Sequence, residues 1–390
     1  MIHRTRTAVA LLVFCLTSGS VSRAAEEDAE VLPTRDTSPL FWSQEERIAG
    51  FRNFDAIYDT RVVDNGTEHL RLTDDPRDFS TLRYEVEGTA YPLDHYLETF
   101  FVAGFLVASG ERILLERYRL GHSETSRWVS FSVAKSVTSL LIGAAIRDGY
   151  IENVDEQVTD YLPRLKGGSY DGATIRDLLQ MASGVAWNES YTDPTSDVAL
   201  AAGLNGLALV NYLAKLPRTA DPGTSFNYNT GETNLAGSVL RAAIGNNAAS
   251  YLAAKMWRPL MEHPATWSIT SDVELGGCCI HATLRDYARI GLFASRAGVL
   301  PDGTRTLPDD WMQESTKGSP SYPGYGYLWW LWGNGRYAAN GIFGQLIWID
   351  PHDDLVIVTQ SAAPAATSPR RSAHRNALID ALRRYAKAMD

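Results

Sequence analysis

The sequence predicts an α/β (α+β) fold, in which an antiparallel sheet built from both chain ends carries flanking helices and an all-α lobe is inserted between them. Three observations lead to this prediction. A β-rich hairpin pattern lies near the start, helical patterns fill the middle, and β-rich patterns return near the end. A lone hairpin is marginally stable. The early strands therefore need partners, and the later strand patterns are the candidates.

The first strong pattern along the chain is a β-hairpin. Residues 101–109 and 112–120 are rich in β-branched and aromatic side chains, with Gly110 and Glu111 between them. The next pattern, over 133–147, is apolar nearly all round, and a glycine follows shortly after its end. This is typical of a buried helix with a glycine cap.

Helical periodicity continues through the middle of the chain, and strand patterns return after it. The helical segments are 173–182, 204–216, 231–243 and 248–257. Thr283 and Asp286 form a variant of the capping box, which opens a further helix to about Arg296. Strands are then predicted at 325–332, 344–350 and 355–361, and a last amphipathic helix at 371–388.

The first residues indicate a secretory signal peptide over 1–24. Arg4 and Arg6 precede an apolar run from Ala8 to Leu16, and small residues lead to Ala24. The run is roughly half of the ~20 residues that a membrane span needs, so a retained anchor is the weaker alternative. We expect an exported bacterial protein, periplasmic or secreted, without a stable membrane anchor after the signal is removed.

The rest of the chain divides into an arm and a body. Residues 25–79 are polar, irregular and interrupted by prolines, which predicts an N-terminal arm laid over the body. Residues 80–386 are predicted to form one catalytic domain, with an α/β lobe over 80–130 and 271–386 and an α lobe over 131–270. The sequence does not indicate an oligomeric state.

Composition and cysteine usage exclude several classes of protein. With 45% hydrophobic and 21% charged residues the chain is globular, and its net charge of −10 argues against a nucleic-acid partner. Cys278 and Cys279 are adjacent, and neighbouring cysteines rarely bridge comfortably, so we expect no disulfide scaffold. No histidine or second cysteine pair lies at zinc spacing, and neither a metal nor a cofactor is predicted.

The strongest chemical signal is the pair Ser132 and Lys135 at the start of the buried helix. Residues three apart share a helix face, so the ammonium lies one turn from the hydroxyl. The free N–H groups of a helix N-terminus suit a developing oxyanion. Apolar surroundings lower the pKa of a lysine toward that of a useful base. A Ser-x-x-Lys motif also arises by chance, but an unpaired buried lysine is costly without a purpose.

Four blocks in order resemble the β-lactamase-related serine hydrolases: 128–136, 226–231, 276–291 and 341–345. The resemblance runs from Phe101 to Ala386 and is closest to 6-aminohexanoate-dimer hydrolases and family VIII carboxylesterases. It implies a β-lactamase/transpeptidase-like fold with the active site between the lobes, and a serine hydrolase of the penicillin-recognising rather than the Ser-His-Asp type.

The resemblance also implies roles for individual residues. Ser132 would be the nucleophile, Lys135 its proton partner and Tyr228 the second member of the relay, with either of the last two as the formal base. A phenol near an ammonium has a lowered pKa, so we expect Lys135 and Tyr228 to titrate as a coupled pair. The N–H groups of Ser132 and Ile342 would form the oxyanion hole. Substrate contacts are expected from Trp187, Asn229, Gly341, Phe343 and Trp330.

Departures from the family pattern limit the substrate. Asn229 is out of register with the asparagine that orients a β-lactam amide, and Ala339-Asn340-Gly341 stands where lactamases have Lys-Thr-Gly. The cation that would hold a substrate carboxylate is therefore missing, and penicillin turnover should be poor. In block 185–191, Trp187 stands where nylon-oligomer hydrolases have a tyrosine that assists amide cleavage, which weakens the case for an amidase.

These residues predict a serine hydrolase that cleaves a small-molecule carboxylic ester or amide through an acyl-enzyme. An ester is favoured because an alkoxide leaves without the protonation that an amine requires. Two alternatives stay open: an amidase of the 6-aminohexanoate-oligomer type, and a non-catalytic, penicillin-binding-like protein that captures a ligand without turnover.

Overall fold

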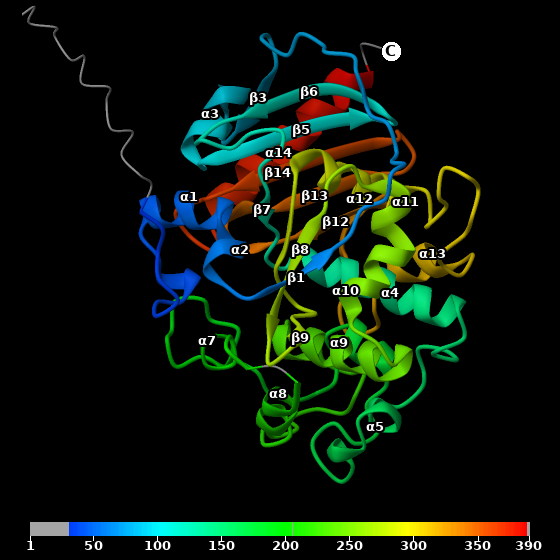
Figure 1. Cartoon of the computed structure of the whole chain (residues 1–390). Helices are drawn as coiled ribbons and strands as arrows, with labels where there is room; N and C mark the ends of the chain where they lie inside the picture. The colour runs from blue at the N-terminus through cyan, green and yellow to red at the C-terminus, as the bar shows by residue number, and fades with distance from the viewer. Residues whose placement is uncertain (1–30, 205, 388–390) are drawn as a thin grey trace, which may run out of the picture. The chain divides into compact units, whose positions relative to one another are not determined.

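The computed structural model describes residues 31–204 and 206–387, so the predicted signal peptide lies outside the described residues. Within the described residues, no helix combines the length and the apolar character that crossing a membrane requires. The predicted fold class is confirmed: strands from both chain ends share one sheet, and helices dominate the segment between them (Figure 1).

The described residues form a large sheet of seven strands, which holds the core. Its strands, in spatial order, are β11 (Trp330–Gly333), β12 (Arg336–Asn340), β13 (Leu346–Asp350), β14 (Leu355–Ser361), β5 (Val102–Ser109), β6 (Arg112–Tyr118) and β2 (Thr73–Asp74). Neighbours are antiparallel except β2 and β6. The predicted hairpin is β5–β6, and its strand β5 pairs with β14, placing Val107 opposite Ile357.

A smaller sheet and a separate hairpin complete the strands. The smaller sheet contains β1 (Thr60–Val63), β8 (Ala265–Thr270), β10 (Ile280–Ala282), β7 (Trp128–Val129) and β9 (Val273–Glu274). The hairpin pairs β3 (Arg83–Val86) with β4 (Thr89–Pro92). Strand β1 belongs to the predicted arm, so the arm contributes a strand to the body by pairing with β8.

The helices include the two that matter most for the site, α4 (Val133–Arg147) and α9 (Thr230–Ile244). The others are α1 (Gln44–Arg52), α2 (Phe54–Ile57), α3 (Leu93–Thr99), α5 (Val158–Tyr161), α6 (Ile175–Leu179), α7 (Asp197–Leu200), α8 (Gly206–Leu213), α10 (Ala248–Leu252), α11 (Arg258–Leu260), α12 (Leu284–Ser295), α13 (Trp311–Ser315) and α14 (Pro369–Lys387). Short single turns are η1 (Pro39–Phe41), η2 (Pro163–Leu165), the π-type η3 (Ala253–Trp257) and η4 (Ile342–Gly344).

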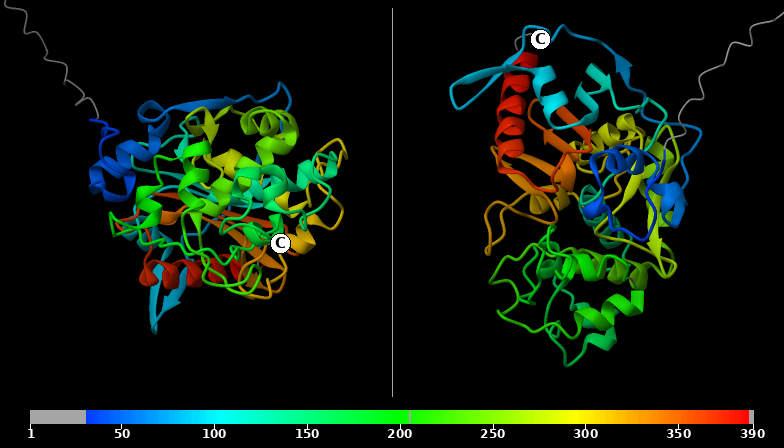
Figure 2. Two further views of the ribbon diagram at one scale, coloured as in Figure 1. Left: turned by 90° about the horizontal axis from the view of Figure 1, so that it is seen from below. Right: turned by 90° about the vertical axis from the view of Figure 1, so that its left-hand side faces the viewer.

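Alternation along the strands divides the large sheet into two buried faces. Phe105 and Val107 of β5 pack in one cluster with residues of α3 and α14. Leu106 and Ala108 point the other way, into the main core with α12 and α4. Both views in Figure 2 keep α14 (red) against the strands, while the right-hand view gathers α5, α8 and α9 (green) below them.

Helix α4 is buried along its length, as predicted: residues 133–145 are buried without a break. It ends as the sequence indicates, because Gly149 has φ +80° and Tyr150 N–H donates to Ala145 O. This is the Schellman arrangement, which satisfies the last carbonyl groups of a helix. The predicted helix after Thr283 is likewise confirmed, since the Thr283 side chain accepts from the N–H of Asp286.

Three predicted segments differ from the structure. The strand at 325–332 shortens to β11 because the chain turns before it: Leu328 has φ +62° and Gly326 N–H donates to Trp329 O. The helix at 173–182 shortens to α6, and Met181 beyond it has φ +55°. The arm is less irregular than expected, because Ser43 and Glu46 form a capping box that opens α1.

A buried acid in α9 gives the first testable prediction. Glu232 is 1% exposed, and burial raises its pKa from 4.5 to about 8, although hydrogen bonds from Ser183 and Asn229 oppose the rise. Between these two pH values the unfolded chain is ionised at this position while the folded chain holds a proton. The group therefore lowers the free energy of unfolding as pH rises from about 4.5 to 8, by on the order of a few kcal/mol.

We expect Glu232→Gln to remove this contribution, because glutamine keeps an oxygen acceptor for Ser183 and carries no charge. Urea unfolding at pH 5 and pH 8 should show a smaller stability loss for the variant than for the wild type. The exposed Glu68→Gln serves as a control and should follow the wild type. Equal losses for Glu232→Gln and the wild type would contradict the buried, protonated state.

Candidate active site

Ser132 lies between β7, a strand of the smaller sheet, and the first residue of α4. Ser130, just before it, is fixed by two hydrogen bonds to Ile280, one from its N–H at 2.8 Å and one to its Oγ at 2.9 Å. Phe131 has φ +44°, a backbone conformation that non-glycine residues adopt only where packing holds them. The ring of Phe131 packs between those of Phe51 and Phe343, with ring centroids 4.9 and 5.5 Å apart, respectively. Ser132 is therefore held at the N-terminus of α4.

Ser132 lines a cavity of about 510 Å³. The wall comes from the N-terminal arm, the loop after Trp187, α9 and the segment 268–279, and it includes Leu40, Tyr58, Tyr191, Thr230 and Ile342. This places the predicted nucleophile at the surface of a space large enough for a small-molecule substrate.

Lys135 lies behind this wall, 1% exposed. Its Nζ donates to Thr230 Oγ1 at 2.8 Å and lies 5.2 Å from the ring centroid of Tyr228. Burial lowers the pKa of Lys135 from 10.5 to about 8, although the carboxylate of Glu189 opposes this shift. The ammonium is thus poised to lose its proton close to neutral pH, as the sequence indicated.

Tyr228 departs from its expected titration. Burial, and then the negative charge of Glu189, raise its pKa well above the ordinary value, while a hydrogen bond with Ser132 only partly opposes the rise. The expected lowering by a neighbouring ammonium is wrong, because desolvation of the phenolate outweighs it. The structure does bring Tyr228 within hydrogen-bonding reach of Ser132. The ring of Trp330 stacks on the ring of Tyr228, with their centroids 5.6 Å apart.

Ile342 and Ser132 both line the cavity, as an oxyanion hole requires. Across the part of the chain that the structure describes, neither backbone N–H has a hydrogen-bond partner. The turn that carries Ile342 is held on both sides, because Gly341 N–H donates to Gln345 O and Phe343 N–H donates to Ala366 O. Two fixed N–H groups are thus available to a ligand oxygen.

The residues expected to contact substrate are not among those that line the Ser132 cavity. Asn229 is buried and caps α9, accepting from the N–H of Glu232 at 3.0 Å. Trp187 is buried and donates to Glu189. Gly341 packs against Ser130 O and Gln345. Phe343 is 1% exposed in an aromatic cluster, and Trp330 supports Tyr228. Phe343 lines a neighbouring cavity instead, and the other four line neither of the two.

Glu189 is the residue that sequence reasoning missed. Its carboxylate accepts from Tyr191 Oη at 2.8 Å, from the N–H of Thr230 at 3.0 Å, and also from Thr230 Oγ1 and Trp187 Nε1. Thr230 therefore connects Lys135 to a carboxylate. The only signal was an acidic residue between two aromatic ones, and nothing in the spacing placed it beside α9.

Tyr191 also lies on the cavity wall. By its place in the sequence, Trp187 stands where nylon-oligomer hydrolases have the tyrosine that assists amide cleavage. The same block supplies a tyrosine four residues later, and this one reaches the cavity. Burial raises the pKa of Tyr191 far above the ordinary value, so its hydroxyl keeps its proton.

Cys278 and Cys279 both line the cavity, and the structure joins them in a disulfide, a bridge that neighbouring cysteines rarely form. The loop that carries them passes close to the lysine, because a Cβ on Gly277 would lie 3.0 Å from Lys135 Nζ. Among the described residues, no group of three or more His, Cys, Asp or Glu is arranged to hold a metal ion.

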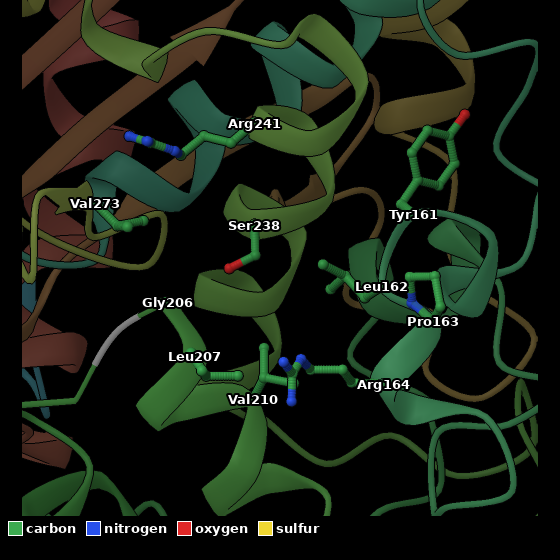
Figure 3. A pocket seen from close by; sticks show the side chains of 10 residues that line it. All are labelled: Tyr161, Leu162, Pro163, Arg164, Gly206, Leu207, Val210, Ser238, Arg241 and Val273. Atoms are coloured by element: carbon green, nitrogen blue, oxygen red, sulfur yellow. The ribbon is translucent and has the colours of Figure 1, made fainter.

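A separate cavity of about 330 Å³, shown in Figure 3, lies between α8, α9 and residues 161–164. It shares no lining residue with the Ser132 cavity. Its Arg241 is paired with Glu274 at 2.8 Å, and Ser238 donates to Asn234 O within its own helix. Nothing in this cavity resembles a nucleophile with a base.

Comparison with known proteins identifies the family of the chain. Residues 95–382 match the Beta-lactamase family. The 6-aminohexanoate-dimer hydrolase of Paenarthrobacter ureafaciens is 31% identical over 311 aligned positions, and the match covers 73% of this chain and 78% of that protein.

Solved structures share the fold. A Bacillus anthracis protein, provisionally named a 6-aminohexanoate-dimer hydrolase, has a TM-score of 0.80 at 22% identity, covering 91% of this chain and 99% of that one. A family VIII carboxylesterase has a TM-score of 0.58 at 17% identity, covering 75% and 95%. The chain therefore belongs to the β-lactamase family, as a β-lactamase-related serine hydrolase with the 6-aminohexanoate-dimer hydrolases among its relatives.

Proposed function

We propose that the protein cleaves small-molecule carboxylic esters, and with them amides, through an acyl-enzyme on Ser132. The observation that carries the proposal is the position of Lys135: a buried amine of lowered pKa, one helical turn from a serine that lines a cavity. Such an amine has a purpose when it takes a proton from the serine. The substrate class follows the relatives, which include both an amide hydrolase by name and a carboxylesterase.

In the proposed cycle Ser132 Oγ attacks the carbonyl carbon of the substrate, and Lys135 takes the proton of the Ser132 hydroxyl. Tyr228, which is hydrogen-bonded to Ser132, is the second member of the proton relay. Lys135 is the better base of the two, because its pKa is lowered while that of Tyr228 is raised. The N–H groups of Ser132 and Ile342 stabilise the oxyanion. As the bond to the leaving group breaks, Tyr228 gives its own proton to that group and takes in its place the proton that Lys135 holds. Water then attacks the acyl-enzyme, the neutral Lys135 takes the proton of the water, and this proton returns to Ser132 Oγ as the acid leaves.

The direct test is hydrolysis of p-nitrophenyl acetate and butyrate by the protein without residues 1–24, which we propose to be a cleaved signal. Turnover with an initial burst of nitrophenolate supports an acyl-enzyme. A protein that is neither acylated nor active on either ester would instead fit the non-catalytic ligand-binding alternative.

An amidase is the second candidate, and Tyr191 favours it. An amine leaves only after protonation, and Tyr191 keeps its proton on the cavity wall. In the free protein this hydroxyl donates to Glu189, so it would exchange that hydrogen bond for one to the leaving nitrogen. We expect Tyr191→Phe to lower kcat for an amide, such as the 6-aminohexanoate dimer, by about 10-fold or more, and to change kcat for p-nitrophenyl butyrate much less.

The two substrates are to be measured side by side on the same enzyme preparation. The exposed Tyr322→Phe is the matched control. If Tyr191→Phe lowers kcat equally for the ester and the amide, Tyr191 does not protonate the leaving amine. If the wild type is inactive on every amide tested, the amidase candidate is excluded and the esterase is the one left.

A further inference from the structure

A second cavity, of about 400 Å³, adjoins the Ser132 cavity. Leu40 and Tyr191 line both of them, and Phe343, which lines the second, directly follows Ile342 of the first. The two cavities therefore lie side by side. Its remaining wall includes Arg47 of α1, Glu189 and residues 364–367.

Arg47 supplies the positive charge of the second cavity, and not all of its N–H donors have a hydrogen-bond acceptor. Its Nη1 donates to Pro364 O at 2.9 Å, and its guanidinium lies 5.0 Å from the ring centroid of Phe343. Its Nε is buried without a hydrogen-bond partner, and within residues 31–204 and 206–387 no carboxylate forms an ion pair with it. A partly buried guanidinium in this state needs an acceptor, and the best acceptor is an anion.

Glu189, the other charged group of the cavity, does not meet this need. Four donors already occupy its carboxylate: Trp187, Tyr191, and both the N–H and the hydroxyl of Thr230. Arg35, a cation that lines the Ser132 cavity, is paired with Asp59 at 2.8 Å. Among the described charged groups that line the two neighbouring cavities, the guanidinium of Arg47 is thus the one with a buried N–H donor that has no acceptor.

We propose that Arg47 binds a carboxylate at the far end of the substrate, so that the preferred substrates are esters or amides that carry a free carboxylate. This inference rests on the proposed function and names its substrate class. Ala339 stands where lactamases place a lysine, and Arg47 supplies a cation from a different element, the first helix of the arm. An Arg fork also matches carboxylate geometry better than a lysine does.

The test compares each carboxylate substrate with its methyl ester, which has the same length and no charge. One pair carries the group on the acyl side, mono-4-nitrophenyl adipate against methyl 4-nitrophenyl adipate. The other carries it on the alcohol side, the butyrate ester of 3-(4-hydroxyphenyl)propanoic acid against that of its methyl ester. We expect the wild type to prefer the carboxylate in one pair, through KM rather than kcat.

Arg47→Gln should lower this kcat/KM ratio by roughly 10- to 100-fold, the loss expected for a charge-assisted hydrogen bond. Arg47→Lys should lower it less. Arg117→Gln, which removes an exposed cation from β6, should leave the ratio as in the wild type. A ratio unchanged by Arg47→Gln in both pairs overturns the inference, and so does a ratio that falls only in Arg35→Gln.

A binding measurement separates this inference from the proposed function. Calorimetry on Ser132→Ala, which cannot turn substrate over, compares monomethyl adipate with dimethyl adipate. Suppose that monomethyl adipate binds more tightly than dimethyl adipate, and that adding Arg47→Gln to Ser132→Ala removes the difference. The carboxylate site at Arg47 is then supported even if the protein hydrolyses no ester. If both ligands bind alike, the site is refuted even where neutral esters are hydrolysed.

Discussion

Ser132→Ala is expected to lower kcat/KM for p-nitrophenyl butyrate by about 10⁴-fold or more, the scale seen when the nucleophile of a serine hydrolase is removed. The reason is that, in the proposed cycle, the acyl-enzyme forms on Ser132 Oγ, one helical turn from Lys135. The Thr230 hydroxyl also lines the cavity and accepts from Lys135, but it donates its own proton to Glu189. The variant should keep its fold, since Ser132 makes no side-chain cap to α4.

The matched control is Ser139→Ala on the same helix. Ser139 is fully buried and its hydroxyl has no hydrogen-bond partner among the described residues, so its removal should leave activity intact. Mass spectrometry after brief exposure to the ester should find the butyryl group on the wild type and none on Ser132→Ala. A Ser132→Ala protein with the wild-type rate would show that the nucleophile is another residue.

Lys135 should govern the pH dependence of acylation. As a base it must be neutral, and its pKa of about 8 means that the neutral fraction grows as pH rises through 8. We therefore expect kcat/KM for the ester to increase with pH up to about 8 and to level off above it. Lys135→Ala should lose roughly 10²- to 10⁴-fold and with it this pH dependence.

Lys135→Arg makes the test sharper, because arginine keeps the positive charge and cannot give up its proton. If Lys135 acts as a base, the arginine variant should be as inactive as the alanine variant. If its role is purely electrostatic, arginine should rescue activity. Lys317→Ala, an exposed lysine distant in the chain from the motif, should retain the wild-type profile.

Much of the fold could be predicted because its elements are encoded locally. The hairpin β5–β6, the buried helix α4 and the capped helix α12 each depend on a pattern confined to a few residues. The turn that shortens the expected strand 325–332 to β11 could not be predicted. It depends on backbone hydrogen bonds to residues distant in the chain, such as the one from Leu328 N–H to Leu179 O. Strand β1 was missed for the same reason: it exists through β8.

The candidate site divides in the same way. Ser132 and Lys135 belong to one helix, so their spacing predicted their proximity. Glu189, Tyr191 and Arg47 lie on irregular or early segments, and only the tertiary fold brings them to α9 or η4. The titration of Tyr228 was predicted with the wrong sign because charge was weighed and burial was not. Asn229 was expected to contact substrate although it is out of register with the family asparagine, and its side chain instead caps the N-terminus of α9.

The pairing of β5 with β14 has a consequence for how the protein is made. During translation β5 leaves the ribosome early, while its neighbour on one side is among the last segments to be synthesised. Until then one edge of the hairpin is open, and such edges readily pair with other chains. Contacts this distant in the chain also slow folding. We expect nascent chains to depend on chaperones, and chains cut short before β14 to aggregate rather than fold.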